Sequence, residues 1–286
     1  MDLNRLKIFC EVYRHKSYSL AAKKVSLTQS AISQQIKTLE NELNVKLFDL
    51  KERSRPTSAG DYLYKEGVRL IAQVEDIENG IKHVSGVGGG NVRFGMIDVA
   101  AIHLMPKVLG KFKDAHSNVK LDAVVKTSGE LIDMVERYEL DFAVVVTNDA
   151  PETLVRKDIY SDSIVAVVKK NSPLDRKHIS VKMLKGEPLI LYPQFSHSRQ
   201  LIEGVFRKNG IVPTVSMEMH YPAAILSLVE QGMGVGLISA LSAKEINLKG
   251  ESVVLIDELK GARKIGIVFH KGRRPSPQTQ ALIGLV

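Results

Sequence analysis

The sequence predicts an α+β protein in which a small helical domain and a long helix precede a larger α/β domain. Three observations support this prediction. Apolar residues recur at helical spacing through residues 1–84, a glycine-rich segment follows at 86–91, and short apolar strands then alternate with helices. With 286 residues, of which 44% are hydrophobic and 25% charged, the chain can bury a substantial core.

Positive charge is concentrated near the N-terminus. The chain has a formal net charge of +8, and residues 1–57 hold 11 of its 40 Lys and Arg residues but only 6 of its 32 acidic residues. A local basic excess favours a polyanionic partner, although charge alone identifies none.

Cysteine content and hydropathy indicate the compartment. Cys10 is the single cysteine, so no intramolecular disulfide can form, which suits a reducing environment. The sequence has no signal peptide and no apolar run of the roughly 18 residues that a membrane span requires. We therefore expect a cytoplasmic protein with no membrane partner.

A helix-turn-helix is predicted in the first 57 residues. Apolar residues recur at helical spacing over 3–13, Ser19 is placed to cap a second helix over 20–25, and Thr28 is placed to cap a third helix. Two short helices joined by a tight turn form this motif. The charged segment 49–57 lacks apolar periodicity and predicts a β-hairpin wing.

The third helix begins with small polar side chains that face away from the predicted core. A recognition helix presents such side chains to base edges in the major groove, while nearby basic residues contact phosphates. The predicted DNA-binding residues are Ser17, Thr28, Gln29, Ser30, Ser33, Gln34, Lys37, Arg53 and Arg55.

A linker and dimerisation helix is predicted over 58–85. Its apolar or small positions alternate steps of four and three, as in the a/d seam of a coiled coil. A single buried amphipathic helix is the alternative, but a helix between two domains has little else to pack on. The glycines of the hinge at 86–91 lack the spacing of a phosphate-binding loop. The seam comprises Leu63, Gly67, Leu70, Val74, Ile77, Ile81 and Val84.

An α/β domain with largely parallel sheets is predicted over 92–286. Two subdomains around a cleft are expected, with the chain crossing between them near 160–170 and 265–270. Ligands in such folds lie at strand C-termini and helix N-termini. Strands are predicted at 92–97, 119–125, 142–146, 164–168, 189–192, 215–219, 235–238, 253–256 and 264–269.

The N-terminal motifs resemble those of the LysR-type transcriptional regulators, and the resemblance extends over nearly the whole chain. This sequence matches five motifs of the family in order. They are the paired alanines, the Ser/Thr-Gln-x-Ala-x-Ser helix start, and the Ile-x-x-Leu-Glu, Leu-Phe and Thr-x-Ala-Gly motifs. The matching segments are Ala21-Ala22, Thr28–Ser33, Ile36–Glu40, Leu47-Phe48 and Thr57–Gly60.

Two positions depart from this family pattern. Leu50 stands where an arginine usually follows the Leu-Phe pair, and Ser30 stands where proline is common. The wing contact of that arginine would then be made by Arg53 or Arg55.

The C-terminal region is similar to the family's sensor domain, a relative of periplasmic binding proteins. Matches include Gly95, Pro106, Thr127-Ser128-Gly129, Ser196–Arg199 and the glycines of 232–236. The resemblance implies a small-molecule effector in the cleft, and hydroxyls at helix starts suit a carboxylate or another small anion. The predicted effector-binding residues are Asp98, Val99, Ala100, Thr127, Ser128, Thr147, Ser196, His197 and Ser198.

Asp98 and His197 are unusual for this cleft. The family often has Ser or Thr in the loop of Asp98, and a carboxylate there would repel an anion unless a cation or Arg199 compensates. Asp98 would alternatively bind the amine of an amino acid or polyamine, or cap a helix, which is the interpretation we favour. His197 replaces a usual glycine; it would bind ligand or sense pH, although most loop histidines do neither.

The resemblance implies a sequence-specific DNA-binding transcription regulator that a small-molecule effector modulates. Expected partners are double-stranded promoter DNA, a small anion or amino-acid-like effector, further copies in a homodimer or homotetramer, and RNA polymerase. We expect no catalytic residue, no metal ligand and no cofactor, because G-x-S-x-G, H-E-x-x-H and C-x-x-C motifs are missing and the eight histidines lack metal spacing. A cytosolic solute-binding protein without specific DNA binding and an enzyme using the cleft are the alternatives.

Overall fold

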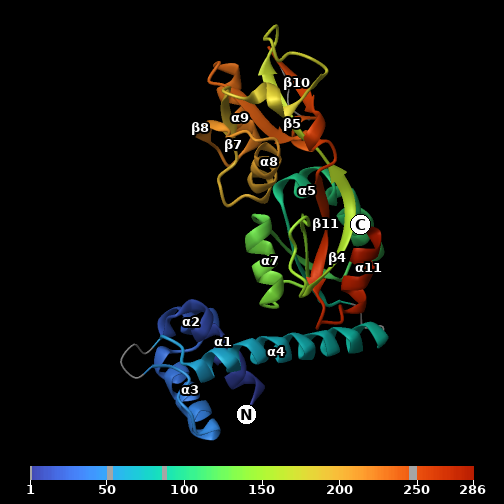
Figure 1. Cartoon of the computed structure of the whole chain (residues 1–286). Coiled ribbons are helices and arrows are strands. Elements are labelled where there is room, and N and C mark those ends of the chain that lie inside the picture. Colours follow the sequence, from blue (N-terminus) through green and yellow to red (C-terminus); the bar gives the residue numbers. More distant parts are fainter. Residues whose placement is uncertain (1, 50–53, 86–88, 245–249) are drawn as a thin grey trace. The chain divides into compact units, whose positions relative to one another are not determined.

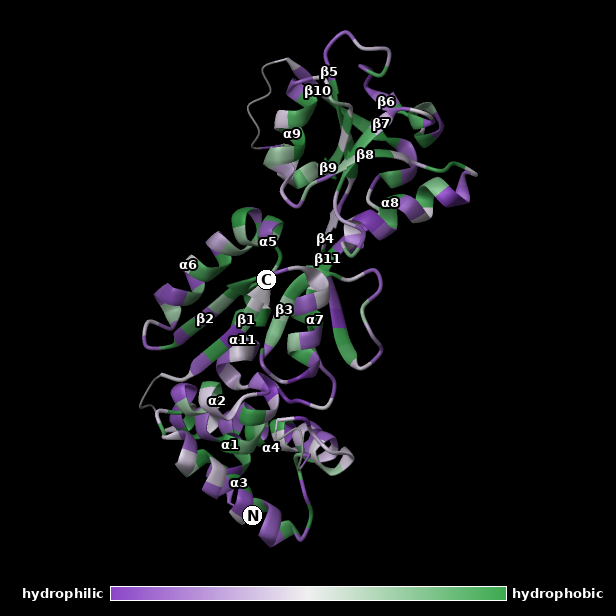
Figure 2. Ribbon diagram, turned by 90° about the vertical axis from the view of Figure 1, so that its left-hand side faces the viewer, coloured by the Kyte–Doolittle hydropathy of each residue, from purple (hydrophilic) through white to green (hydrophobic). Residues whose placement is uncertain are grey.

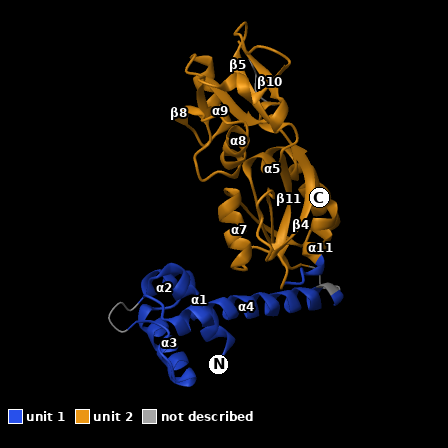
Figure 3. Ribbon diagram, in the orientation of Figure 1, with its two compact units in different colours: residues 1–88, 273–277 blue, residues 89–272, 278–286 orange. Residues whose placement is uncertain are grey.

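The computed structural model describes residues 2–49, 54–85, 89–244 and 250–286 (Figure 1). The chain forms two compact units, residues 1–88 with 273–277 and residues 89–272 with 278–286 (Figure 3). Among the helices of the described residues, none has the length and hydropathy that a membrane crossing requires.

Polar side chains cap the helices of the first unit. Asp2, Ser17 and Thr28 accept hydrogen bonds from backbone amides two or three residues ahead, at 3.2, 3.3 and 3.2 Å. The expected cap Ser19 was wrong: the extended backbone of Ser17 directs its hydroxyl to the amide of Leu20, so the second helix begins earlier. These helices are α1 (Leu3–His15), α2 (Tyr18–Lys24), α3 (Gln29–Leu43) and α4 (Ser58–Val84).

The predicted wing has a short antiparallel stem. Phe48 and Pro56 pair across it, and the amide of Asp49 donates to the carbonyl of Arg55 at 2.8 Å. Buried Glu40 fixes the approach to this stem, because its carboxylate accepts from the amide of Leu47 at 2.9 Å. The tip of the wing, including the predicted contact Arg53, lies outside the described residues.

Helix α4 has one face in the core of the first unit and one exposed apolar face. Gly67, which was expected in the seam, lies in the core instead: a Cβ there would meet Cδ1 of Leu6 at 2.8 Å. The same unit includes Arg273, whose guanidinium donates to both carboxylate oxygens of Asp76 on α4, at 2.8 and 2.9 Å. The exposed apolar face comprises Leu70 (41% exposed), Ile77 (62%), Ile81 (63%) and Val84 (86%).

The first sheet of the second unit has five strands in the order β2-β1-β3-β11-β4. Four helices accompany this sheet (Figure 2): α5 (Asp98–His103), α6 (Met105–Ala115), α7 (Ser128–Glu136) and α11 (Pro277–Leu285). Their buried apolar side chains form one core with those of the strands. The strands are β1 (Asn91–Met96), β2 (Lys120–Val125), β3 (Phe142–Val146), β4 (Leu154–Asp162) and β11 (Arg263–His270).

The second sheet has six strands in the order β6-β10-β5-β9-β7-β8. Helices α8 (His197–Lys208), α9 (Pro222–Glu230) and α10 (Ala240–Ala243) and short 3-10 turns at Val181–Leu184 and Asp257–Leu259 complete this subdomain. The strands are β5 (Ile164–Lys169), β6 (His178–Ile179), β7 (Pro188–Leu191), β8 (Thr214–Glu218), β9 (Val235–Ser239) and β10 (Glu251–Ile256).

The sheets are mixed rather than largely parallel. Strand β11 is antiparallel to both β3 and β4, and β5 is antiparallel to both β9 and β10, because these strands belong to the two passages between subdomains. The first passage, from β4 to β5, lies in the predicted region. The second runs from β10 to β11 over 257–262, earlier than the expected 265–270, which lies inside strand β11.

Candidate DNA interface and ligand pocket

The recognition helix predicted from the sequence corresponds to α3. Its inner face carries Ile32, Ile36 and Leu39, which are at most 3% exposed and hold the helix on the core of the first unit. Because residues three or four apart share a helix face, the polar residues between them share the outer face. The exposed outer residues are Gln29, Ser30, Ser33, Gln34 and Lys37.

Other predicted DNA-binding residues lie at helix starts and on the wing. The hydroxyls of Ser17 and Thr28 are engaged as caps of α2 and α3, and that of Thr28 also lies 3.0 Å from the hydroxyl of Ser30. Arg55 is exposed on the stem of the wing. Lys23 and Lys24, exposed in the last turn of α2, add positive charge that the sequence analysis did not assign to the interface.

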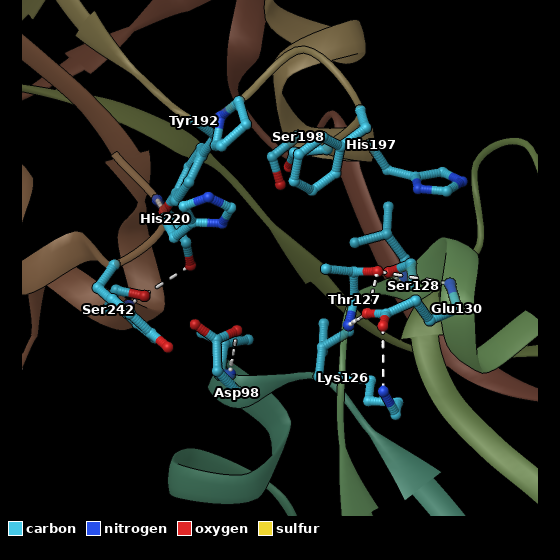
Figure 4. Close-up of a pocket in the computed structure, with 18 of the residues that line it drawn as sticks. Asp98, Lys126, Thr127, Ser128, Glu130, Tyr192, His197, Ser198, His220 and Ser242 are labelled. Atoms are coloured by element: carbon cyan, nitrogen blue, oxygen red, sulfur yellow. Dashed lines mark hydrogen bonds and ion pairs between the residues drawn. The ribbon is translucent and has the colours of Figure 1, made fainter. Parts of the chain in front are cut away.

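A pocket of about 360 Å³ lies in the second unit, and both subdomains contribute to it. The segments after β1 and β2 and the last residue of β3 line it from one subdomain, and the segments that follow β7, β8 and β9 line it from the other. Figure 4 shows side chains from these segments pointing into a common space. Seven of the predicted effector-binding residues line it: Asp98, Val99, Thr127, Ser128, Ser196, His197 and Ser198.

Two predicted residues are placed elsewhere. Ala100 is fully buried in the core of the first sheet and is not among the described residues that line the pocket. Thr147 is likewise fully buried, and its hydroxyl donates to the carboxylate of Asp158 at 2.6 Å. Both residues follow a strand closely in the sequence, but their side chains are buried within the protein.

Most hydroxyls of the pocket are engaged within the protein. Thr127 caps α7 in a capping box, in which the carboxylate of Glu130 accepts from the Thr127 amide at 3.0 Å and from its hydroxyl at 2.8 Å. These bonds, and then Lys126, lower the pKa of Glu130 to about 2. The Ser128 hydroxyl accepts from the amide of Val146 at 3.1 Å.

A buried polar network lies on the other side of the pocket. Arg263 donates to Oγ of Ser198 at 3.1 Å and to the carboxylate of Asp162 at 2.8 Å. The hydroxyl of Ser239 donates to the same carboxylate at 2.6 Å. Burial raises the pKa of the adjacent Tyr192 to about 12, so its phenol stays neutral and hydrogen-bonding. This network joins the two passages between subdomains.

Asp98 is exposed toward the pocket and is the first residue of α5, whereas Ile97 holds the N-cap position. Its carboxylate accepts from the neighbouring amide of Val99 at 2.7 Å, so it assists the helix start without being the N-cap that we favoured. Arg199 does not compensate the charge of Asp98. Its guanidinium is buried and donates hydrogen bonds to the carbonyl of Tyr192 and to the carboxylates of Glu203 and Glu218.

His197 faces the other subdomain across the pocket. Its Cε1 atom lies 3.7 Å from the place where a Cβ on Gly129 of α7 would stand. Burial lowers the pKa of His197, so the imidazole is neutral at pH 7. This arrangement favours a packing or hydrogen-bonding role over a charged one.

The sequence analysis missed the aromatic part of the pocket. Tyr192, Phe195, His220 and Tyr221 line it, together with the charged Arg263. The rings of Phe195 and His220 lie 5.6 Å apart between centroids. These residues come from segments far apart in the sequence, and no local motif marks them.

The exposed polar helix of the first unit and the pocket of the second define a class of protein, a DNA-binding regulator with a ligand-binding domain. Two family models match the chain: a bacterial regulatory helix-turn-helix protein of the lysR family over residues 3–61, and the LysR substrate binding domain over residues 85–286. The chain belongs to the LysR family of transcriptional regulators.

Known proteins with similar sequences and folds are consistent with this family membership. The HTH-type transcriptional regulator CbbR of Rhodospirillum rubrum is 27% identical over 286 residues, which span 99% of this chain and 95% of the relative. Among solved structures, CbnR complexed with its target DNA has a TM-score of 0.65 at 19% identity, covering 100% of this chain and 99% of that one. A full-length variant of OxyR from Pseudomonas aeruginosa has a TM-score of 0.77 at 17% identity, covering 100% and 94%.

These findings distinguish between the functions considered from the sequence. The chain is a DNA-binding transcription regulator with an effector-binding domain, as predicted, and neither an enzyme nor a solute-binding protein without specific DNA binding.

Proposed function

We propose that α3 reads base edges in the major groove of promoter DNA through its exposed polar face. The observation that carries this proposal is the exposure of Gln29, Ser33 and Lys37 on a helix whose opposite face is fixed in a core. Ser33 and Gln34 have donors and acceptors of the kind that distinguish base pairs, while Lys37, Arg53 and Arg55 supply charge for phosphates. Ser17, Thr28 and Ser30 complete the predicted interface.

The pocket is proposed as the effector site. Its lining comes from both subdomains, so a bound molecule contacts both and stabilises one arrangement of them over another. An effector shifts the equilibrium only by the difference in its affinity for the two states. That shift would change how the protein bends DNA or contacts RNA polymerase in the cytoplasm.

The proposed domain organisation follows the sequence analysis. We assign residues 1–57 to the DNA-binding domain, 58–85 to the linker and dimerisation helix, 86–91 to a hinge, of which 86–88 lie outside the described residues, and 92–286 to the effector domain. The apolar face of α4 supports a homodimer or homotetramer, in which the linker helix sets the spacing of two half-sites.

Ser33→Ala and Gln34→Ala test the proposed interface. Operator sequences are first selected from a randomised double-stranded DNA library with the full chain, and affinities are then measured by fluorescence anisotropy at fixed salt. Each variant should lose about 1–3 kcal/mol, or roughly 5- to 150-fold, on the selected sequence and much less on random DNA.

Asn41→Ala provides the matched control, because Asn41 is exposed at the C-terminal end of the same helix. Its affinity for the selected sequence should equal that of the unmodified chain. Normal affinity in both the Ser33 and the Gln34 variants would contradict the assignment of α3's outer face to base recognition.

A further inference from the structure

The ligand pocket contains one carboxylate that no cationic side chain of the described residues neutralises. The charged groups of the lining are otherwise paired: Arg263 lies 2.8 Å from the buried Asp162, and Lys126 lies 3.1 Å from Glu130. Within the described part of the chain, Asp98 has no ion-pair partner. The pocket therefore carries an uncompensated negative charge.

The carboxylate of Asp98 is available to a ligand. Its one hydrogen bond among the described residues comes from the adjacent amide of Val99, which leaves further lone pairs of both oxygens for other donors. Figure 4 shows the side chain pointing into the pocket, on the side where His220 and Ser242 lie. An ammonium group has three N–H donors for such a carboxylate, and the charges strengthen each bond.

The start of α7, which suited an anion in the sequence, is already occupied by an acid of the protein. The carboxylate of Glu130 accepts hydrogen bonds from the amide and the hydroxyl of Thr127, so a carboxylate of the protein itself occupies the start of α7. The hydroxyls of Ser128 and Ser198 accept hydrogen bonds from the amide of Val146 and from Arg263, which leaves their O–H donors to orient toward the ligand. A purely anionic ligand would meet the carboxylate of Glu130 at the start of α7 and the charge of Asp98.

Exposed aromatic rings add a second feature that suits a cation. Phe195 is 59% exposed and Tyr221 is 71% exposed, and both line the pocket with His220. Large aromatic side chains are costly to leave in water, and their faces attract ammonium and guanidinium groups within about 6 Å. Aromatic rings and an unpaired carboxylate together recognise an organic cation.

From this combination we infer that the effector is a small organic molecule with an ammonium group bound to Asp98, of the size of an amino acid or a short diamine. The pocket volume of about 360 Å³ sets the size limit. This inference rests on the proposed effector role of the pocket and adds the charge class of its ligand.

The test uses four-carbon compounds that differ in charge. The series comprises 1,4-diaminobutane with two ammonium groups, 4-aminobutanoate with one ammonium and one carboxylate, succinate with two carboxylates, and 1,4-butanediol with two hydroxyls. L-lysine and L-arginine extend the series. Each is added to the full chain, the melting temperature is recorded, and compounds that raise it are titrated by calorimetry. An ammonium compound at about 100 times its Kd should give a readily measured increase.

Asp98→Asn removes the charge without changing the size of the side chain. The variant should bind the ammonium compound at least 10-fold more weakly, while Asp114→Asn, an exposed acid on α6 outside the pocket lining, should bind it unchanged. Equal ligand-free melting temperatures show that both variants are folded. The inference is overturned if no ammonium compound of the series binds, if only succinate or the diol binds, or if Asp98→Asn binds as tightly as the unmodified chain.

DNA-binding measurements with the same compounds separate this inference from the proposed function. If an ammonium compound binds through Asp98 but leaves affinity for the selected DNA and the bending of that DNA unchanged, the ligand class stands and the effector role fails. If only succinate changes DNA binding, the effector role stands and the inference fails.

Discussion

Single side chains in the pocket have roles that depend on their hydrogen-bond partners rather than on residue type. Glu130 shows this most clearly, because its carboxylate completes the capping box of α7 instead of remaining open to a ligand. Ser128 and Ser198 likewise hold parts of the protein together. A hydroxyl at a helix start is therefore weak evidence for a ligand contact where it has an internal partner, as those of Thr127, Ser128 and Ser198 do. The carboxylate of Asp98 has only one such partner, the amide of Val99, among the described residues.

The depressed pKa of Glu130 predicts a pH dependence of stability. Its folded pKa of about 2 lies below its ordinary value of 4.5, so its contribution is complete above pH 4.5 and is lost as the pH falls toward 2. In urea denaturation, Glu130→Gln should be less stable than the unmodified chain at pH 6, by about 0.3–1 kcal/mol for an exposed helix-terminal charge. The difference should shrink between pH 4.5 and 2, and a constant difference over that range would contradict the assigned role.

At the scale of elements, the first turn of α4 is in close backbone contact with the segment that leads into the wing. A Cβ on Gly60 would lie 2.3 Å from the carbonyl oxygen of Leu47, and the amide of Gly60 donates to the hydroxyl of Thr57 at 3.1 Å. Only glycine permits this approach, which gives a physical reason for the Thr-x-Ala-Gly motif.

Gly60→Ala should therefore destabilise the chain by about 1–3 kcal/mol, because the backbone must move to admit the methyl group. The matched substitution is Gly110→Ala on the exposed side of α6, where nothing lies within 4 Å of the added Cβ. That variant should gain about 0.5–1 kcal/mol from helix propensity. Denaturation followed by circular dichroism measures both; equal effects of the two substitutions would contradict the close-packing argument.

At the scale of the whole molecule, the exposed apolar face of α4 is the feature on which the proposed homodimer or homotetramer rests. Ile77 and Ile81 are more than half exposed, although the helix buries its other face on α1. Exposed apolar residues repeated along one helix face are typical of a helix–helix interface.

The double variant Ile77→Glu, Ile81→Glu should shift the protein toward monomer and weaken its binding to the selected DNA, because paired half-sites need paired domains. Lys65→Glu, which changes an exposed charge on α4 outside this apolar face, is the control and should leave the assembly unchanged. Light scattering after size-exclusion chromatography measures the mass. An unchanged mass of the double variant would remove this face from the proposed interface.

Local patterns were sufficient to predict most elements and the outer face of α3. The spacing of Ile32, Ile36 and Leu39 determines which side of that helix is buried, and therefore which polar residues face out. Most strands of the second unit were predicted within one or two residues from short apolar runs. Strand β4 was missed because it lies at a sheet edge with mainly exposed or half-buried residues and lacks such a run.

The sequence by itself determined the helix-turn-helix, the long helix and the alternating α/β region, because caps and apolar periodicity act between near neighbours. Only the tertiary structure decided which residues line the pocket and which of them are paired. The passages between subdomains bring Arg263 beside Asp162, 101 residues apart, and the folding of the second subdomain brings Tyr192, His220 and Tyr221 to the same pocket. These contacts depend on the order of strands in mixed sheets, and that order is set by long-range packing that no local spacing records.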